Sequence, residues 1–335
     1  MEFRPLDSTS EEWDRRIAAY PTKSLFHLSA WLNYLEKTQN GRRIQLEIVE
    51  GGLTIGYFAA LMIQKGPFRI LGSPLTGWTT ESMGPVVDTH FGQEAFITAL
   101  ESYCHQERVD HIEISAPVLQ GSVWLSRGYE CQKGETPIVN LSREEDQMWK
   151  KLTDRKAVRK ARQQGLIVED ATDPAFVCTY YHQLTEVFTR KKLVPTYPLA
   201  RVEQLFRLLK PADLLFSLQV RYQDQVIATG LFPHDDHFMY FWGGASRQAF
   251  LQLRPNDLLH WSAMSLAGQR GIEKYHLGGG INPFKLKFGG SVVEYHRWFK
   301  SFSSVAKAAR IGYYTYQKGR QAFLGFLQQK KAPSR

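Results

Sequence analysis

The strongest constraint on the fold is an internal repeat. A single offset aligns residues 43–58 with 215–230 and, without a gap, residues 67–73 with 239–245. Each copy reads as three strands separated by two polar turns, because alternating apolar runs are interrupted by EGG and KGP or by QDQ and HDDH. The sequence therefore predicts two antiparallel meanders, one in each half of the chain. A chance similarity between two alternating patterns is the alternative.

The elements around the two meanders repeat as well. An amphipathic helix follows each meander, at 92–106 and 255–269, and leads into a further strand at 111–115 and 274–278. Helices are also predicted before each meander, at 29–38 in the first copy and at 174–190 and 199–209 in the second. This order predicts an α+β protein with two tandem lobes, each a helix-flanked, mostly antiparallel sheet. We expect lobes at 1–141 and 142–300, the second including a basic helix at 146–164, and a basic C-terminal helical tail at 301–335.

The composition excludes several protein classes. With 43% apolar and 22% charged residues, the chain of 335 residues can bury substantial cores. No apolar run reaches the ~18 residues of a membrane span, and the first residues are acidic and polar. Three widely spaced cysteines suggest neither a disulfide framework nor a zinc site. We expect a monomeric, cytoplasmic protein that uses no metal and no bound cofactor.

The net charge of +9 resides in the last residues. Residues 295–335 contain nine basic and no acidic residues, so the rest of the chain is formally neutral. A segment of one sign is suited to a polyanion such as tRNA, phosphorylated lipid or the anionic inner face of a membrane. The alternative is a tail whose charge only keeps it solvated.

A basic segment lies between the two lobes. At helical spacing Arg155, Arg159 and Arg162 share one face of the predicted helix. Guanidinium groups offer a planar fork of donors that fits phosphate, so Arg155 and Arg159 are predicted to bind substrate phosphates. A solvated linker helix is the other interpretation.

Residues 278–290 form the most unusual passage, GGGINPFKLKFGG. Five glycines and a proline predict a loop beyond the last strand of the second lobe, where sheets of this kind open their ligand cleft. Lys285 is predicted to stabilise the oxyanion of an attacked carbonyl, with Lys287 and Phe284 contacting substrate. Tyr240 and Trp242, which share a strand face, are predicted to line the cleft. A glycine-rich turn with surface lysines is the alternative.

In the first lobe, the segment 77–88 breaks the regular pattern and ends at Asp88. A carboxylate at this point can orient or deprotonate an attacking ammonium, since an amine must lose a proton to become a nucleophile. A helix cap or a turn residue is the simpler interpretation. The HDDH segment is interpreted as a solvated turn, and no GxSxG, GxxxxGK[ST] or HExxH motif occurs.

Together, several passages resemble the FemAB-like transferases, whose two lobes are each similar to the GNAT acyltransferase fold. They are FHLSAWLNYLEKT, SMGPVVD, DRKAVRKARQQGLIVE, LRPNDLLHWSAM and NPFKLKFGG, and the resemblance covers residues 20–300. It implies that Lys285 contacts the substrate phosphate and the reacting carbonyl, that Asp88 lies near the acceptor amine and that Arg155 or Arg159 binds a nucleotide diphosphate. Trp31, in the first of these passages, is a further substrate-binding candidate.

Two departures from the family pattern bear on the donor. The early lysine of the family has no clear match, since only Lys37 is available there. LRPND also replaces the [QR]xxGx[GA] turn by which GNAT enzymes hold the pyrophosphate of coenzyme A through successive N–H groups.

The resemblance implies an N-acyltransferase. We expect it to move an acyl or aminoacyl group from aminoacyl-tRNA or an acyl thioester to a phosphorylated or lipid-linked amine of a cell-envelope, polysaccharide or peptide-like acceptor. The alternatives are an acyltransferase that uses acyl-CoA or acyl carrier protein on an amino sugar or small molecule, and a non-catalytic scaffold bound to membrane or nucleic acid.

Overall fold

The structure is a computed structural model that describes residues 1–88 and 91–331. Side chains of the last helix are described up to Tyr316, together with Gly319. The chain forms two compact units: residues 1–135 with 294–311, and residues 136–293 with the chain from 312 onward. The strands β7 (Glu130–Asn140) and β14 (Ser291–Ser301) cross the boundaries between the units, whereas the predicted boundaries fall at the ends of these strands.

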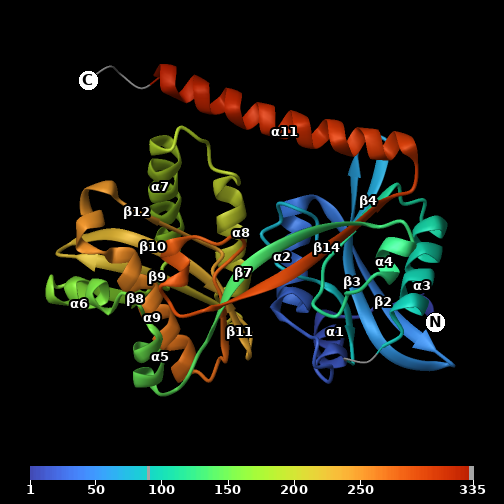
Figure 1. Cartoon of the computed structure of the whole chain (residues 1–335), viewed down its shortest axis with the longest axis horizontal. Coiled ribbons are helices and arrows are strands. Elements are labelled where there is room, and N and C mark those ends of the chain that lie inside the picture. The colour runs from blue at the N-terminus through green and yellow to red at the C-terminus, as the bar shows by residue number, and fades with distance from the viewer. Residues whose placement is uncertain (89–90, 332–335) are drawn as a thin grey trace. The chain divides into compact units, whose positions relative to one another are not determined.

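The first unit contains the first copy of the repeat (Figure 1). Its elements, besides parts of β7 and β14 and the start of α11 (Ser304–Lys331), are β1 (Glu2–Pro5), α1 (Ser10–Ile17), the 3-10 helix η1 (Leu25–His27), α2 (Ser29–Gln39), β2 (Gly41–Glu50), β3 (Leu53–Lys65), β4 (Phe68–Ser73), β5 (Gly84–Val87), α3 (Gln93–Gln106), β6 (His111–Ile114) and α4 (Val123–Ser126). Its strands follow the order β1-β2-β3-β4-β6-β14. β4 and β6 are parallel, whereas β1–β2, β2–β3, β3–β4 and β6–β14 pair antiparallel.

The segment predicted to be irregular around residues 77–88 contains a strand. β5 pairs antiparallel with the first half of β3. The pairing depends on Gly56, because a Cβ at that position would lie 2.4 Å from the carbonyl oxygen of Val86. Only a glycine lets the two backbones approach this closely. The prediction of an irregular segment was therefore wrong for Gly84–Val87.

The second unit contains the second copy of the repeat. Its elements are α5 (Glu145–Lys151), α6 (Arg155–Gln163), β8 (Ile167–Asp170), α7 (Ala175–Arg190), α8 (Leu199–Leu209), β9 (Leu215–Tyr222), β10 (Gln225–Pro233), β11 (Phe238–Tyr240), β12 (Gly243–Ser246), the 3-10 helix η2 (Gln248–Leu253), α9 (Pro255–Gln269), β13 (Lys274–His276) and α10 (Pro283–Leu286). Strands β12-β10-β9-β8 form an antiparallel sheet, and β7, β13 and β11 are neighbours in another.

Each unit has its own apolar core. Phe58, Phe96 and Trp298 are among the buried residues of the first, and Phe216, Trp261 and Tyr275 are among those of the second. The α+β class, the two helix-flanked sheets and the C-terminal helix are confirmed. α9 has the bounds that the sequence predicts. Pro255 occupies its first position, where proline is common, and this marks the start of the helix clearly.

Candidate active site

In the second unit the chain changes sheets in the middle of the predicted third strand. β11 pairs in parallel with β13, whereas β12 returns to pair with β10. At the change, the Phe241 amide donates to the His276 carbonyl (2.9 Å) and the Trp242 amide donates to the Leu231 carbonyl (3.1 Å). The prediction of one strand at 239–245 was therefore wrong. β13 pairs with β11 but not with β12, so β12 and the chain that follows β13 part here, and the hydrogen bonding between them stops.

Tyr240 and Trp242 lie on either side of this parting and are both buried. The Trp242 ring packs against Tyr197, with 4.7 Å between ring centroids, and the Tyr240 ring packs against His276. The indole Nε1 of Trp242 is buried without a hydrogen-bond partner among the described residues. A buried donor of this kind is costly, so it is a natural contact for a bound molecule. That Tyr240 and Trp242 line a substrate cleft stays a prediction.

The glycine-rich loop begins at the parting. The Phe241 carbonyl oxygen lies 3.4 Å from the Cβ position of Gly278, whose φ of +78° favours glycine. The Lys285 Nζ donates to the carbonyl oxygens of Gly278, Gly279 and Gly280, at 2.9, 2.8 and 3.0 Å. An ammonium has three N–H donors, so these bonds use all of them. Oxyanion stabilisation by Lys285 stays a prediction. It requires that the Lys285 ammonium give up its hydrogen bond to one of the three loop carbonyls and donate to the substrate oxygen instead.

The second lysine of the loop is paired. The Lys287 ammonium contacts the carboxylate of Asp257, and both side chains are largely buried, at 13% and 5% exposed. It also lies over the Phe284 ring, 4.1 Å from the centroid. Asp257 is in the first turn of α9, where a negative charge is stabilised by the helix dipole. Lys287 and Phe284 thus tie the loop to α9, and their contact with substrate stays a prediction.

His260, one turn further along α9, lies beneath the loop. Its Nδ1 is 2.7 Å from the Tyr275 hydroxyl, and its ring stacks on Phe288 with 5.0 Å between centroids. Burial lowers the pKa of His260 to about 3, and the charges of Lys287 and Lys285 act in the same direction. The imidazole is therefore neutral at physiological pH. Sequence reasoning missed His260 and Asp257, although two ionisable residues three apart in a helix with no others were a signal.

We expect His260 to make the protein sensitive to acid. The unfolded chain binds a proton at this histidine below pH 6.5, whereas the folded chain does not until about pH 3, so the stability that His260 contributes is lost as pH falls between these values. Between pH 7.5 and 4.5 the free energy of unfolding should fall by about 2–3 kcal/mol more in the wild type than in His260→Gln. Urea titrations at both pH values measure this difference. His237→Gln, at an exposed histidine, should lose as much as the wild type, and parallel behaviour of His260→Gln would contradict the assignment.

The predicted basic helix at 146–164 is two helices. α5 ends at Lys151, and α6 begins after Asp154, whose side chain accepts from the Ala157 amide and caps the new helix. The single-helix prediction was therefore wrong, because an aspartate at this position favours a helix start. In the break, the Thr153 amide donates to the Lys287 carbonyl at 3.0 Å. This bond joins the start of α6 to the glycine-rich loop.

Arg155 and Arg159 are both exposed on α6. The Arg159 guanidinium lies 5.6 Å from the Trp149 ring centroid, and the opposite side of the helix buries Ala157, Val158 and Ala161. The basic face is thus presented to solvent by a helix that is anchored on its apolar side. Phosphate binding by Arg155 and Arg159 stays a prediction, supported by their exposure.

The remaining candidates, Asp88 and Trp31, lie in the first unit. Asp88 is exposed directly after β5, and together with Tyr57 and Glu47 it adds to the burial that raises the pKa of Tyr20. Trp31 is fully buried in α2, where its indole donates to the Thr80 hydroxyl at 3.2 Å and packs against Phe26. The predicted substrate contact of Trp31 would require that this packing open. The structure defines the Asp88 site and the lysine loop each within its own unit.

Part of the basic C-terminal segment is neutralised within the first unit. Lys300 contacts Glu101 (2.8 Å), and Lys307 (2.8 Å) and Arg310 (3.2 Å) both contact Glu130. Arg297 donates to the Pro74 carbonyl at 2.6 Å. The side chains of Lys318, Arg320, Lys330, Lys331 and Arg335 lie outside the described residues. The sequence analysis counted all nine cations of residues 295–335 as one basic segment. The first four of them have partners within the first unit, so they are not free to bind a polyanion as that count assumed.

Two further properties concern the described ranges as a whole. Within residues 1–88 and 91–331, no helix combines the length and apolar character that a bilayer crossing requires. In the same ranges no three His, Cys, Asp or Glu side chains gather as metal ligands would.

The HDDH turn was predicted to be solvated, but His234 and Asp235 are buried. The amides of His237 and Phe238 donate to the Asp235 carboxylate.

Comparison with known proteins identifies a domain in the second unit. Residues 150–286 match the sequence model of the Acetyltransferase (GNAT) domain. No curated protein sequence matches the chain. The matched segment contains α6, the parted strands, α9 and Lys285 of the loop.

Solved structures show the same fold over nearly the whole chain. FemX is 15% identical with a TM-score of 0.70, covering 88% of this chain and 97% of its own. The C-terminal domain of a putative lysylphosphatidylglycerol synthetase from Agrobacterium fabrum is 15% identical, with a TM-score of 0.54 and coverage of 90% and 96%. A tandem GNAT protein from the clavulanic acid biosynthesis pathway is 7% identical, with a TM-score of 0.55 and coverage of 90% and 98%.

Proposed function

Proceeding from a GNAT domain at residues 150–286 within a FemAB-like fold, we propose that this protein is an N-acyltransferase. It moves an acyl or aminoacyl group from a carrier to the amine of a cell-envelope, polysaccharide or peptide-like acceptor. The observation that carries the proposal is the parting of β12 from the chain that follows β13, at Phe241 and Trp242, directly beside the loop that bears Lys285. We assign the indole N–H of Trp242, which is buried without a hydrogen-bond partner among the described residues, as a donor to the reacting carbonyl.

The reaction proposed is attack of a neutral amine on the donor carbonyl. The new C–N bond forms through a tetrahedral oxyanion, which then expels the carrier hydroxyl or thiol as the C–O or C–S bond breaks. The proton lost by the amine goes to a base, for which Asp88 is the candidate, and the carrier takes up a proton as it leaves. Positioning of the reactants and stabilisation of the oxyanion by Lys285 are the main contributions assigned to the protein.

The start of α9 favours a donor other than coenzyme A. In a typical pyrophosphate site, free N–H groups and the positive end of the helix dipole bind the anion. Here the first turn of α9 contains the carboxylate of Asp257, which is paired with Lys287, and Pro255 removes one N–H donor. A pyrophosphate at this helix end would meet a negative charge. An aminoacyl-tRNA is therefore the donor that we favour, with an acyl thioester as the alternative.

The exposed face of α6 is proposed to hold the phosphates of the donor or of a phosphorylated acceptor. This proposal is supported by the hydrogen bond from the Thr153 amide, two residues before Arg155, to the Lys287 carbonyl of the loop. Arginine is suited to this role because its fork of donors matches two phosphate oxygens.

We expect tRNA to bind with strong salt dependence. In Arg155→Gln/Arg159→Gln, the slope of log K against log salt concentration should be smaller by about 1 for each phosphate that the protein no longer binds. Filter binding or fluorescence anisotropy between about 50 and 200 mM salt measures this slope. The matched double variant Lys191→Gln/Arg207→Gln, which removes two exposed cations elsewhere in the second unit, should keep the wild-type slope. Equal slopes in all three proteins would remove α6 from the binding surface.

The donor is identified by a competition between carriers. Purified protein is supplied with charged tRNA or with acyl thioesters, and product amide is measured with and without RNase. Loss of product after RNase treatment supports aminoacyl-tRNA as the donor. Product that is insensitive to RNase and dependent on the thioester supports the alternative.

A further inference from the structure

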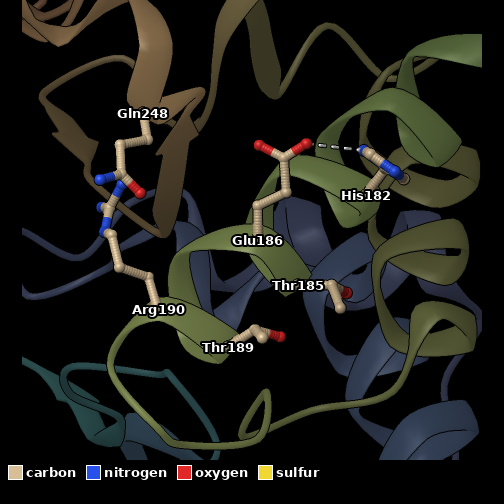
Figure 2. A pocket seen from close by; sticks show the side chains of 6 residues that line it. All are labelled: His182, Thr185, Glu186, Thr189, Arg190 and Gln248. Carbon is tan, nitrogen blue, oxygen red and sulfur yellow. Dashed lines mark ion pairs between the residues drawn. The ribbon is translucent and has the colours of Figure 1, made fainter. Parts of the chain in front are cut away.

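The second unit contains a hollow that the proposed reaction does not use. Its volume is about 480 Å³, within the range of small-molecule sites. Five residues of α7 and one of η2 line it: His182, Thr185, Glu186, Thr189, Arg190 and Gln248. Figure 2 shows that all six side chains end in polar groups. The surface of the hollow is mainly apolar, as in most small-molecule sites, and the few polar side-chain ends are the groups that fix the orientation of a ligand.

Two opposite charges border the hollow without pairing with each other. Glu186 and Arg190 are four residues apart on α7, the spacing and order at which a helix favours an ion pair. The Glu186 carboxylate instead contacts the Nδ1 of His182 at 3.4 Å. Arg190 turns toward Gln248 (Figure 2), and its guanidinium has no ion pair with any residue that the structure describes. An acidic and a basic group therefore face the same open space.

The wall that carries these charges is held in place by a buried contact. The Gln183 side chain is fully buried between α7 and β10, where its Nε2 donates to the Val226 carbonyl and its Oε1 accepts from the Thr229 hydroxyl, both at 2.9 Å. This anchoring fixes the face of α7 that contains Glu186 and Arg190. A ligand that spans them would meet a preformed arrangement.

The hollow is distinct from the parted strands. Gln248 follows the far end of β12, whereas Gly243 begins that strand at the parting. Five residues of extended chain span about 16 Å, so the two sites lie at opposite ends of the strand.

We propose that this hollow binds a small zwitterion. Its ammonium group pairs with Glu186 and its anionic group, a carboxylate or phosphate, pairs with Arg190. The Thr185 hydroxyl, which donates to the Tyr181 carbonyl at 2.9 Å, offers an acceptor to the rest of the ligand, and the Gln248 amide offers both a donor and an acceptor. Bridging the Glu186 carboxylate and the Arg190 guanidinium gives such a ligand an advantage that an amine or an anion alone does not have.

The test uses three probes of equal chain length, 6-aminohexanoate, hexylamine and hexanoate, titrated into the full chain by ligand-observed NMR at low salt. We expect 6-aminohexanoate to bind at least about tenfold more tightly than either probe with one charge, the gain of one charge-assisted interaction. Glu186→Gln should abolish the preference over hexanoate, and Arg190→Gln should abolish the preference over hexylamine. Arg207→Gln, an exposed arginine of α8, is the matched control and should change nothing.

Equal affinities for the three probes would overturn the proposal, and so would a preference that survives in both variants. Each substitution removes one charge from a helical position at the surface, so the variants should fold as the wild type does. Because the measurement is equilibrium binding, its result is independent of whether the protein transfers acyl groups.

Discussion

Replacing Lys287 with methionine is expected to lower the free energy of unfolding by about 3–5 kcal/mol, because it leaves the buried Asp257 carboxylate without its partner. Both charges are shielded from water, so the carboxylate that remains cannot recover its hydration. Urea unfolding at pH 7.5 measures the loss. Lys133→Met, which breaks the exposed pair with Glu294, is the control and should cost less than about 1 kcal/mol.

A second variant separates the ion pair from the packing of the lysine stem. In Lys287→Met/Asp257→Leu both charges are absent, and most of the lost stability should return, since an apolar pair can replace a buried ion pair at little cost. If the double variant is as unstable as the single one, the loss comes from packing against Phe284 and not from an unpaired charge.

Replacing Lys285 with methionine is expected to lower kcat/KM by about 10²–10³, the usual effect of removing one donor to a developing oxyanion. The substitution also frees three carbonyls of the loop, which are then available to water. Steady-state rates with the identified donor measure the change, and Lys274→Met, at an exposed lysine of β13, should keep the wild-type rate. An unchanged rate in Lys285→Met would remove this residue from the reaction.

The sequence predicted those parts of the fold that local patterns determine. The bounds of α9 and the start of α2 at Ser29 were correct. Both depend on signals between residues close together in the sequence: the residue type at the helix start and the apolar periodicity that follows it. The strand at 239–245 was wrong because the chain leaves one sheet and joins another at Phe241 and Trp242. Which sheet each half joins depends on β13 and β10, and that pairing is not encoded in the alternating pattern itself.

The site was only partly predictable for the same reason. The loop at 278–290 was identified from its composition, but the prediction that it holds no helix was wrong, because Asn282 caps the short helix α10 at Pro283–Leu286, and the partners of its lysines were not identified. Lys285 bonds to carbonyls a few residues earlier, and Lys287 bonds to Asp257 in α9. The ion pairs of Lys307 and Arg310 with Glu130 join residues far apart in the sequence, so a count of tail charges overestimated the free positive charge. The fold brings such pairs together, and composition alone cannot reveal them.

The most direct measurement of the central claim is the formation of an amide by the purified protein. The chain is incubated with charged tRNA and acyl thioesters in the presence of an amine-containing cell extract, and mass spectrometry compares the products formed by the wild type and by Lys285→Met. We predict that the wild type adds the mass of the acyl or aminoacyl group to an amine and that the variant does so far more slowly. Absence of any enzyme-dependent amide with every carrier, from a protein that is folded by circular dichroism, would contradict acyl transfer as the function of this fold.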